Sequence, residues 1–219
     1  MSTDSPFEHA GTEALPDLTS RLVNDVKEAR RGGHPETILA AASAAADIIE
    51  QRASKCSNEG QRSALTAVQR FTYSAAADCW PGWSVTAPAV DEPTLARALE
   101  MSRRSARLVE RLGLGHVQQG TAAWLSGAFE LALRRFAEAT ALFSTAQQHF
   151  TAANAFAPAL LTEGYIAIVE QLAPGPTRGG SDLDQICARI DAGNFEESAA
   201  FIEQLRTASK VFTSRKLTG

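Results

Sequence analysis

The sequence predicts an all-α protein built from antiparallel helical hairpins. Apolar residues recur at spacings of three and four along most of its 219 residues, which is the helical period. No stretch shows the pattern expected of a strand. Most connections between the periodic segments are short, and short connections place consecutive helices antiparallel. An irregular Ala-rich helical bundle is the alternative to a stack of hairpins.

The clearest hairpin spans residues 120–153, where small and large residues fall in the order that two packed helices need. Gly127 marks the centre of the first helix, and Ala139, Phe143 and Ala146 follow along the second at spacings of three and four. A glycine at mid-helix removes the side chain that would hold the partner helix away. We therefore expect close helix contact at Gly127.

Nine helices are expected from the periodic segments and from the residues that start or stop them. Asp17 can cap the first helix, Pro35 suits the first turn of the second, and Gly113 ends the fourth. The expected helices span residues 17–31, 35–53, 61–79, 94–112, 116–133, 136–152, 155–171, 182–191 and 195–209.

Two longer connections interrupt these helices. The loop at 80–93 contains three prolines and a Pro-Gly turn signal, and the loop at 173–181 is rich in Pro and Gly. Residues 1–16 are too polar to bury a face, so we expect a flexible N-terminal arm. The remainder, 17–219, is expected to form a single helical-repeat domain.

Composition and charge argue against several classes of protein. The chain has 44% hydrophobic and 21% charged residues, as soluble globular proteins do, and its net charge of -4 argues against a general nucleic-acid binder. No run of about 18 apolar residues indicates a membrane span, and the polar start is unlike a secretory signal. Cys56, Cys79 and Cys187 fit neither a disulfide framework nor a CxxC motif, so we expect reduced thiols and a cytoplasmic protein.

The hairpin at 120–153 resembles a tetratricopeptide repeat (TPR). Gly127 matches the small position of that family's first helix, and the turn and second helix are matched by Phe136, Glu138, Ala139, Phe143 and Ala146. Trp124 lies one place from the family's usual aromatic, Arg134 replaces a customary turn glycine, and the closing proline is absent. Gly164 follows at a spacing close to the roughly 34-residue period of this architecture.

The resemblance implies a right-handed superhelix whose first helices line a groove for a protein or peptide. Trp124 lies on such a helix and is a candidate contact for the partner, with core packing as the alternative. The family's clamp for a terminal carboxylate uses Lys, Arg and Asn. The corresponding face here offers Thr121, Trp124 and Ala128, so we do not expect that type of capture.

Two further features are candidate partner-binding sites. Trp80 and Trp83 share one loop, where exposed rings would form a docking feature, because tryptophan is enriched in binding hot spots. The alternative, which the usual burial of large apolar area favours, is that the rings cover the ends of the third and fourth helices. The second feature is a stripe of guanidinium groups on the fourth helix, formed by Arg97, Arg104 and Arg111. The favoured alternative is that this face of the helix is simply solvated.

No motif predicts catalysis, a metal site or a cofactor. The four histidines never lie three or four places from one another or from a cysteine, and GxSxG is absent. Cys79 is the one thiol to test for reactivity, and we expect it to be buried. The sequence therefore predicts a non-enzymatic scaffold that binds a protein or peptide. A sensor that encloses a small apolar ligand is the alternative, and a homodimer formed through an uncovered terminal hairpin stays open.

Overall fold

The computed structural model describes residues 13–86, 89–174 and 182–214, and in these ranges it contains helices and no strand. The all-α prediction is confirmed. The helices are α1 (Leu15–Gly32), α2 (Pro35–Ala53), α3 (Asn58–Asp78), α4 (Glu92–Arg111), α5 (His116–Ala132), α6 (Phe136–Ala152), α7 (Phe156–Leu172), α8 (Leu183–Ala192) and α9 (Ser198–Ser214), with a 3₁₀ turn, η2 (Pro81–Trp83), after α3. Among these helices, none combines the length and the hydropathy that a membrane crossing needs.

Six of the nine described helices begin one to three residues from their predicted starts, and for α1 and α9 the local reasons are clear. α1 begins earlier, at Leu15, because Pro16 fits a first helical turn, so Asp17 lies within that turn and does not cap the helix. α9 begins later, at Ser198, whose hydroxyl donates to the Ile190 carbonyl and accepts from the Phe195 N–H. These bonds hold the residues before Ser198 in a turn instead of a helix.

The predicted arm and loops are described only in part. Residues 1–12 of the predicted arm and residues 175–181 of the second loop lie outside the described residues. In the first loop, the same holds for 87–88. This loop ends at Asp91, whose carboxylate accepts from the Thr94 N–H at 2.9 Å and so caps α4.

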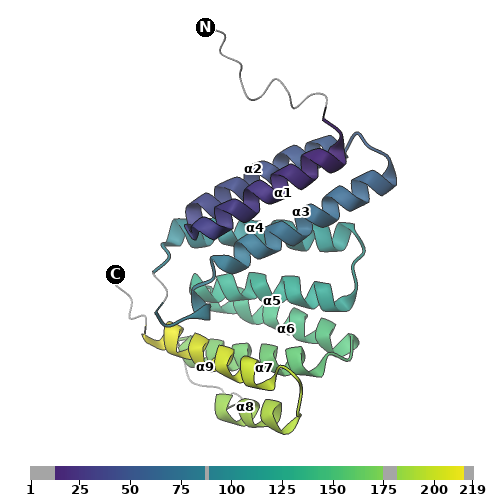
Figure 1. Ribbon diagram of the computed structural model, residues 1–219. Coiled ribbons are helices and arrows are strands. Elements are labelled where there is room, and N and C mark those ends of the chain that lie inside the picture. The colour runs from purple at the N-terminus through teal and green to yellow at the C-terminus, as the bar shows by residue number, and fades with distance from the viewer. Residues whose placement is uncertain (1–12, 87–88, 175–181, 215–219) are drawn as a thin grey trace.

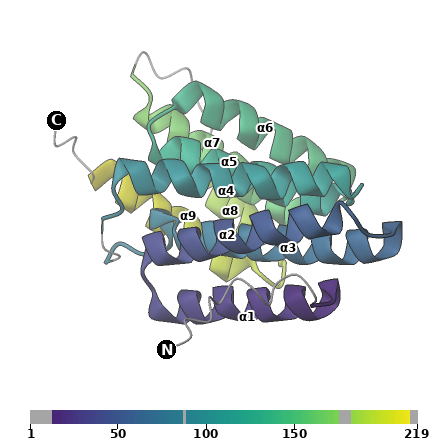
Figure 2. The same ribbon diagram turned by 90° about the horizontal axis from the view of Figure 1, so that it is seen from above.

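The helices form a stack in chain order. Each helix packs against the next one along the chain, from α1 to α9. α1 lies at one end of the stack and α8 at the other (Figure 1). Seen from above, α1 and α6 lie at opposite edges of the molecule, so the stack is also staggered from front to back (Figure 2).

The predicted contact inside the α5–α6 hairpin is confirmed. A Cβ built on Gly127 would lie 3.0 Å from the Phe143 ring, which is tighter than ordinary van der Waals contact. Ala139, Phe143 and Ala146 are fully buried. The two helices approach closely because glycine carries no side chain at the crossing point.

The last helix departs from the hairpin order. α9 packs on α7 and on η2 as well as on α8, and it lies in front of α7 in Figure 1. A Cβ on Gly164 would come within 2.5 Å of Leu205 in α9. Gly164 therefore admits α9, which returns over α7, whereas Gly127 admits its own hairpin partner.

Candidate binding groove

The structure brings the three tryptophans together, although they lie on η2, on the residue before it and on α5. The ring centroids of Trp80 and Trp83 are 4.8 Å apart, and the Trp124 ring lies 5.7 Å from the first and 6.0 Å from the second. Such separations are typical of directly packed aromatic rings. The two candidate features, the tryptophan loop and the first helix of the best hairpin, therefore form one aromatic cluster.

Trp80 is a core residue. Its side chain is 2% exposed, and its indole N–H donates to the Ala128 carbonyl of α5 at 3.2 Å. Tyr165 of α7 and Phe212 of α9 also contact the ring. Packing is therefore the correct interpretation for this residue, but its ring contacts join α5, α7 and α9, away from the expected ends of the third and fourth helices.

Trp83 remains accessible. Its side chain is 47% exposed, while its indole N–H donates to the Ala77 carbonyl of α3 at 2.6 Å. Gly82 holds the loop in this position, because its backbone lies directly on the Trp80 ring, where a Cβ would come within 2.3 Å. One indole is thus buried and its neighbour is presented at the surface.

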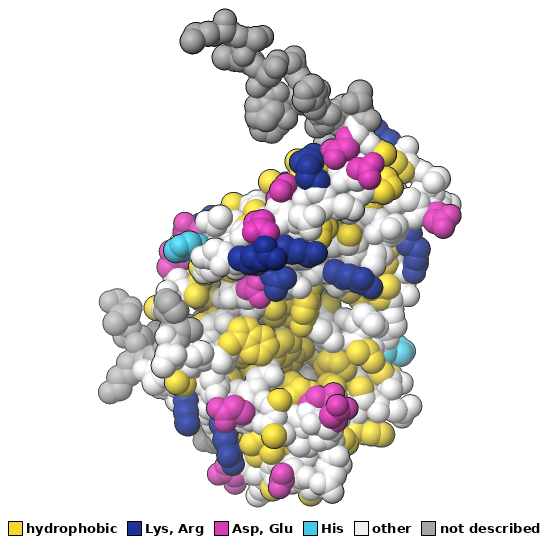
Figure 3. Space-filling view, viewed as in Figure 1, with side chains coloured by type: hydrophobic (Ala, Val, Ile, Leu, Met, Phe, Trp, Pro, Cys, Tyr) yellow, Lys and Arg dark blue, Asp and Glu magenta, His cyan; other side chains and the backbone are white. Residues whose placement is uncertain are grey.

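Trp83 and Trp124 share a cavity of about 240 Å³, which we call the aromatic groove. Trp124 is 6% exposed, and its indole N–H has no hydrogen-bond partner among the described residues. Hydrophobic side chains gather in the hollow between α3 and α9 on this face (Figure 3). The groove is lined by Tyr73, Trp83, Val117, Thr121, Trp124, Phe150, Pro158, Leu161, Phe201 and Gln204.

Basic side chains border the aromatic groove. This basic border was not predicted from the sequence. Trp83 also lines a cavity of about 730 Å³ together with Lys27, Arg30 and Arg31 from the end of α1, and Lys and Arg side chains lie above the hydrophobic patch in Figure 3. Arg30 is paired with Asp78 of α3, with one contact at 3.1 Å. The signal available in the sequence was the basic last turn of the first helix.

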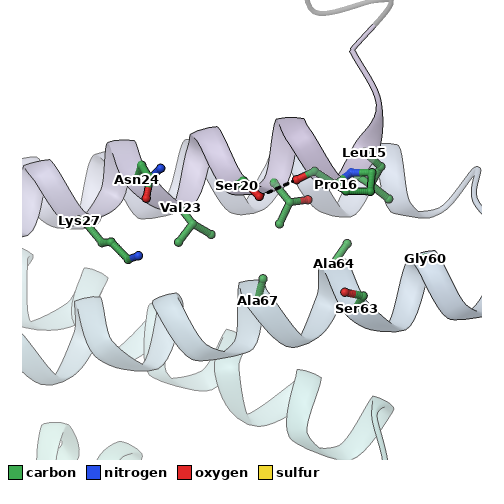
Figure 4. Close-up of a pocket in the computed structure, with 11 residues that line it drawn as sticks. Leu15, Pro16, Ser20, Val23, Asn24, Lys27, Gly60, Ser63, Ala64 and Ala67 are labelled. Atoms are coloured by element: carbon green, nitrogen blue, oxygen red, sulfur yellow. Dashed lines mark hydrogen bonds between the residues drawn. The ribbon is translucent and has the colours of Figure 1, made fainter.

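A third cavity extends this surface between α1 and α3. It has a volume of about 400 Å³ and shares Lys27 with the basic cavity (Figure 4). Val23, Ala64 and Ala67 provide apolar walls, and the hydroxyl of Thr19 is buried without a hydrogen-bond partner among the described residues. The recessed surface therefore continues from the aromatic groove towards the first hairpin.

The arginines of α4 lie elsewhere, and none of them lines the aromatic groove. Arg104 contacts Asp47 and Glu50 of α2 at 2.7 Å each, and Arg97 lies 3.5 Å from Glu36. Two of the three candidates thus tie α4 to α2, which sequence periodicity within one helix could not show. Arg111 is exposed and makes no ion pair with the described residues.

The structure also pairs two histidines that lie far apart in the sequence. The Nδ1 atoms of His116 in α5 and His149 in α6 are 3.1 Å apart. The hairpin creates this contact, so spacing along a single helix gave no sign of it. The described residues contain no group of three or more His, Cys, Asp or Glu side chains that could hold a metal ion.

Cys79 is buried, as expected. Its side chain is 2% exposed, and burial raises the pKa of the thiol to about 12. A thiol with this pKa carries almost no thiolate at neutral pH, and thiolate is the reactive form. Cys79 is therefore a packing residue at the end of α3.

No protein-family model matches the chain, and no curated protein or solved structure matches it.

Proposed function

We propose that this chain is a TPR-like, non-enzymatic scaffold that binds a segment of a protein partner in the aromatic groove. The observation that carries the proposal is the cavity shared by Trp83, which is half exposed, and Trp124, whose indole N–H is unpaired among the described residues. Both residues were candidates from the sequence.

The chemistry of the cavity favours a peptide. Its walls are mainly aromatic and aliphatic, so they suit a large apolar side chain, and aromatic anchors in such pockets supply most of the binding energy of many interfaces. A buried N–H without a partner costs about 1–3 kcal/mol, and a backbone carbonyl of a bound segment would offset this cost. A peptide supplies both groups.

The hairpin geometry supports the TPR-like assignment. Gly127 meets Phe143 at the centre of α5–α6, the small-against-large contact on which the resemblance rests. Arg134, which stands where that family usually has a turn glycine, has a φ of 60°, the backbone conformation that glycine adopts most easily. The free thiols of Cys79 and Cys187, both buried, fit a reducing compartment such as the cytoplasm.

Selection from a phage-displayed random peptide library on the full-length protein tests the proposal. We expect enriched peptides with a large apolar anchor, and we expect Trp83→Ala to abolish their binding while cooperative thermal unfolding is retained. Phe156→Ala is the matched control, since Phe156 is 57% exposed and does not line the groove. Trp80→Ala should instead destabilise the fold by about 3–5 kcal/mol.

Two results would count against the proposal. One is a selection that enriches no peptide, and the other is enriched peptides that bind Trp83→Ala and Phe156→Ala equally well.

A further inference from the structure

The recessed surface beside α3 is continuous, because its three cavities share residues. Trp83 lines both the aromatic groove and the basic cavity of about 730 Å³, and Lys27 lines both the basic cavity and the cavity of about 400 Å³ between α1 and α3. α3 contributes a wall to each of the three, through Tyr73, Asp78 and Ala64 respectively. We call this surface the extended groove.

The length of the extended groove suits a short stretch of extended chain. Tyr73 and Ala64 are nine residues apart on α3, which corresponds to about 14 Å along the helix axis. An extended peptide covers this distance with about four residues. A segment whose apolar anchor lies in the aromatic groove can therefore place a nearby side chain beside α1.

The extended groove carries positive charge without a partner, on a chain whose net charge is -4. Three cations line it, and two of them are already compensated, since Arg30 pairs with Asp78 and Arg31 pairs with Glu28. Lys27 is exposed and makes neither an ion pair nor a hydrogen bond with the described residues. The charge of Lys27 is therefore available to a ligand.

Arg70 adds a second available charge on the exposed surface of α3. It lies three residues after Ala67, which lines the α1–α3 cavity, and three before Tyr73, which lines the aromatic groove. At 3.6 residues per turn, Arg70 thus lies between the faces of α3 that line these two cavities. It is exposed and makes no ion pair within the part of the chain that the structure describes. The aromatic groove itself has no charged lining residue, so its charge selectivity would come from this border.

We propose that the partner segment carries acidic side chains next to its apolar anchor, and that Lys27 and Arg70 bind these carboxylates. The inference rests on the proposed function and adds the chemistry of the partner. Complementary charge of this kind excludes wrong partners and speeds the encounter with the right one. A peptide is favoured over a lipid surface because the apolar side chains line recesses, whereas membrane-bound helices present an outward apolar face.

Parallel peptide selections on the wild-type protein and on Lys27→Glu/Arg70→Glu test this inference. On the wild type we expect Asp and Glu to be enriched within about four positions of the apolar anchor. On the reversed variant we expect Lys and Arg at the same positions. Arg107→Glu/Arg111→Glu is the matched control and should select the same peptides as the wild type, because it makes the same charge change at exposed positions of α4 that line none of the three cavities.

The affinity of one selected peptide, synthesised with an amidated C-terminus, gives the size of the effect. The neutral variant Lys27→Gln/Arg70→Gln should bind it about three- to tenfold more weakly, because exposed ion pairs are individually weak. Added NaCl should weaken binding to the wild type more than binding to the neutral variant. The amide removes the terminal carboxylate, so the loss is assigned to acidic side chains. Thermal unfolding of each variant checks that it is folded.

The outcomes separate this inference from the proposed function. Selected peptides that require Trp83 but show no excess of acidic residues, or that bind the neutral variant as tightly as the wild type, would overturn the inference and leave the proposed function in place. A selection without any Trp83-dependent peptide would remove both. In that case, Trp83-dependent binding to vesicles containing phosphatidylserine would assign the surface to a lipid instead.

Discussion

At the scale of single residues, glycines decide where two helices can approach closely. Gly127 and Gly164 each admit a large residue of another helix, Phe143 and Leu205 respectively. The first contact could be predicted, because both partners lie within one hairpin and follow helical spacing. The second could not, because Leu205 reaches Gly164 only after the chain has passed through α8. Local periodicity contains no information on that return.

Substitution at Gly127 tests the close contact inside the hairpin. We expect Gly127→Leu to lower the free energy of unfolding by about 1–3 kcal/mol, because the added side chain would push Phe143 out of its position. The same change at Gly32 is the control, since a Cβ there meets nothing within 4 Å, and it should be close to neutral. Urea denaturation of both variants gives the comparison. Equal losses would show that Gly127 has no special packing role.

At the scale of elements, three successive turns end their helices in the same way. Gly113, Arg134 and Asn154 have φ values of 60°, 60° and 55°, and each lies between helices that pack on each other. In each turn the next residue donates its N–H back to the carbonyl five places earlier, which is the Schellman pattern. One turn geometry thus generates α4–α5, α5–α6 and α6–α7.

The repeated turn makes a prediction at Asn154, which is exposed and contributes mainly its backbone conformation. Asn154→Ala should lower the free energy of unfolding by about 1 kcal/mol, because alanine with a positive φ brings its Cβ close to the carbonyl oxygen that follows. Asn154→Gly should keep or raise it, because glycine adopts this conformation freely. Chemical denaturation monitored by circular dichroism separates the two. A glycine variant as unstable as the alanine variant would refute the explanation from backbone conformation.

The elements themselves were largely predictable from sequence. The 3.6-residue period located the helices, and proline at Pro35 and glycine at Gly113 marked a start and an end that the structure confirms. The predicted start of α9 was wrong because the Ser198 hydroxyl donates back to the Ile190 carbonyl, across the preceding turn. Hydrogen bonds of that kind cannot be predicted from the sequence, since many serines precede helices without making them.

At the scale of the whole molecule, the chain is ordered almost linearly. Each helix packs on its neighbours in sequence, α1 and α2 also contact α3 and α4 respectively, and α9 returns onto α7 and η2. The aromatic groove depends on that return, because Phe201 and Gln204 of α9 form one of its walls. Trp83 and Trp124 were candidates from the sequence, but their contact could not be predicted, since it requires the loop after α3 to fold over α5. The pairing of Arg104 with α2 and of His116 with His149 was unpredictable for the same reason.

A linear stack predicts graded protection from hydrogen exchange. The α5–α6 hairpin is flanked by α4 and α7 and contains fully buried residues such as Phe129 and Phe143, whereas α1 has neighbours on one side only. Units at the end of such an array open more readily than central ones. We expect the amides of α5 and α6 to exchange most slowly and those of α1 faster, as measured by mass spectrometry under native conditions. Uniform protection of all helices would indicate a single cooperative unit.

The crowding of all three tryptophans has an optical consequence. Their ring centroids are separated by 4.8–6.0 Å, so excitation can pass among the indoles, and the intrinsic emission of the whole protein originates from one place. The molecule thus carries its own label at the aromatic groove. A shift of the tryptophan emission spectrum in dilute buffer therefore reports on ligand entry there without any added dye. Unfolding changes the emission of the same indoles, so its spectrum must be recorded separately.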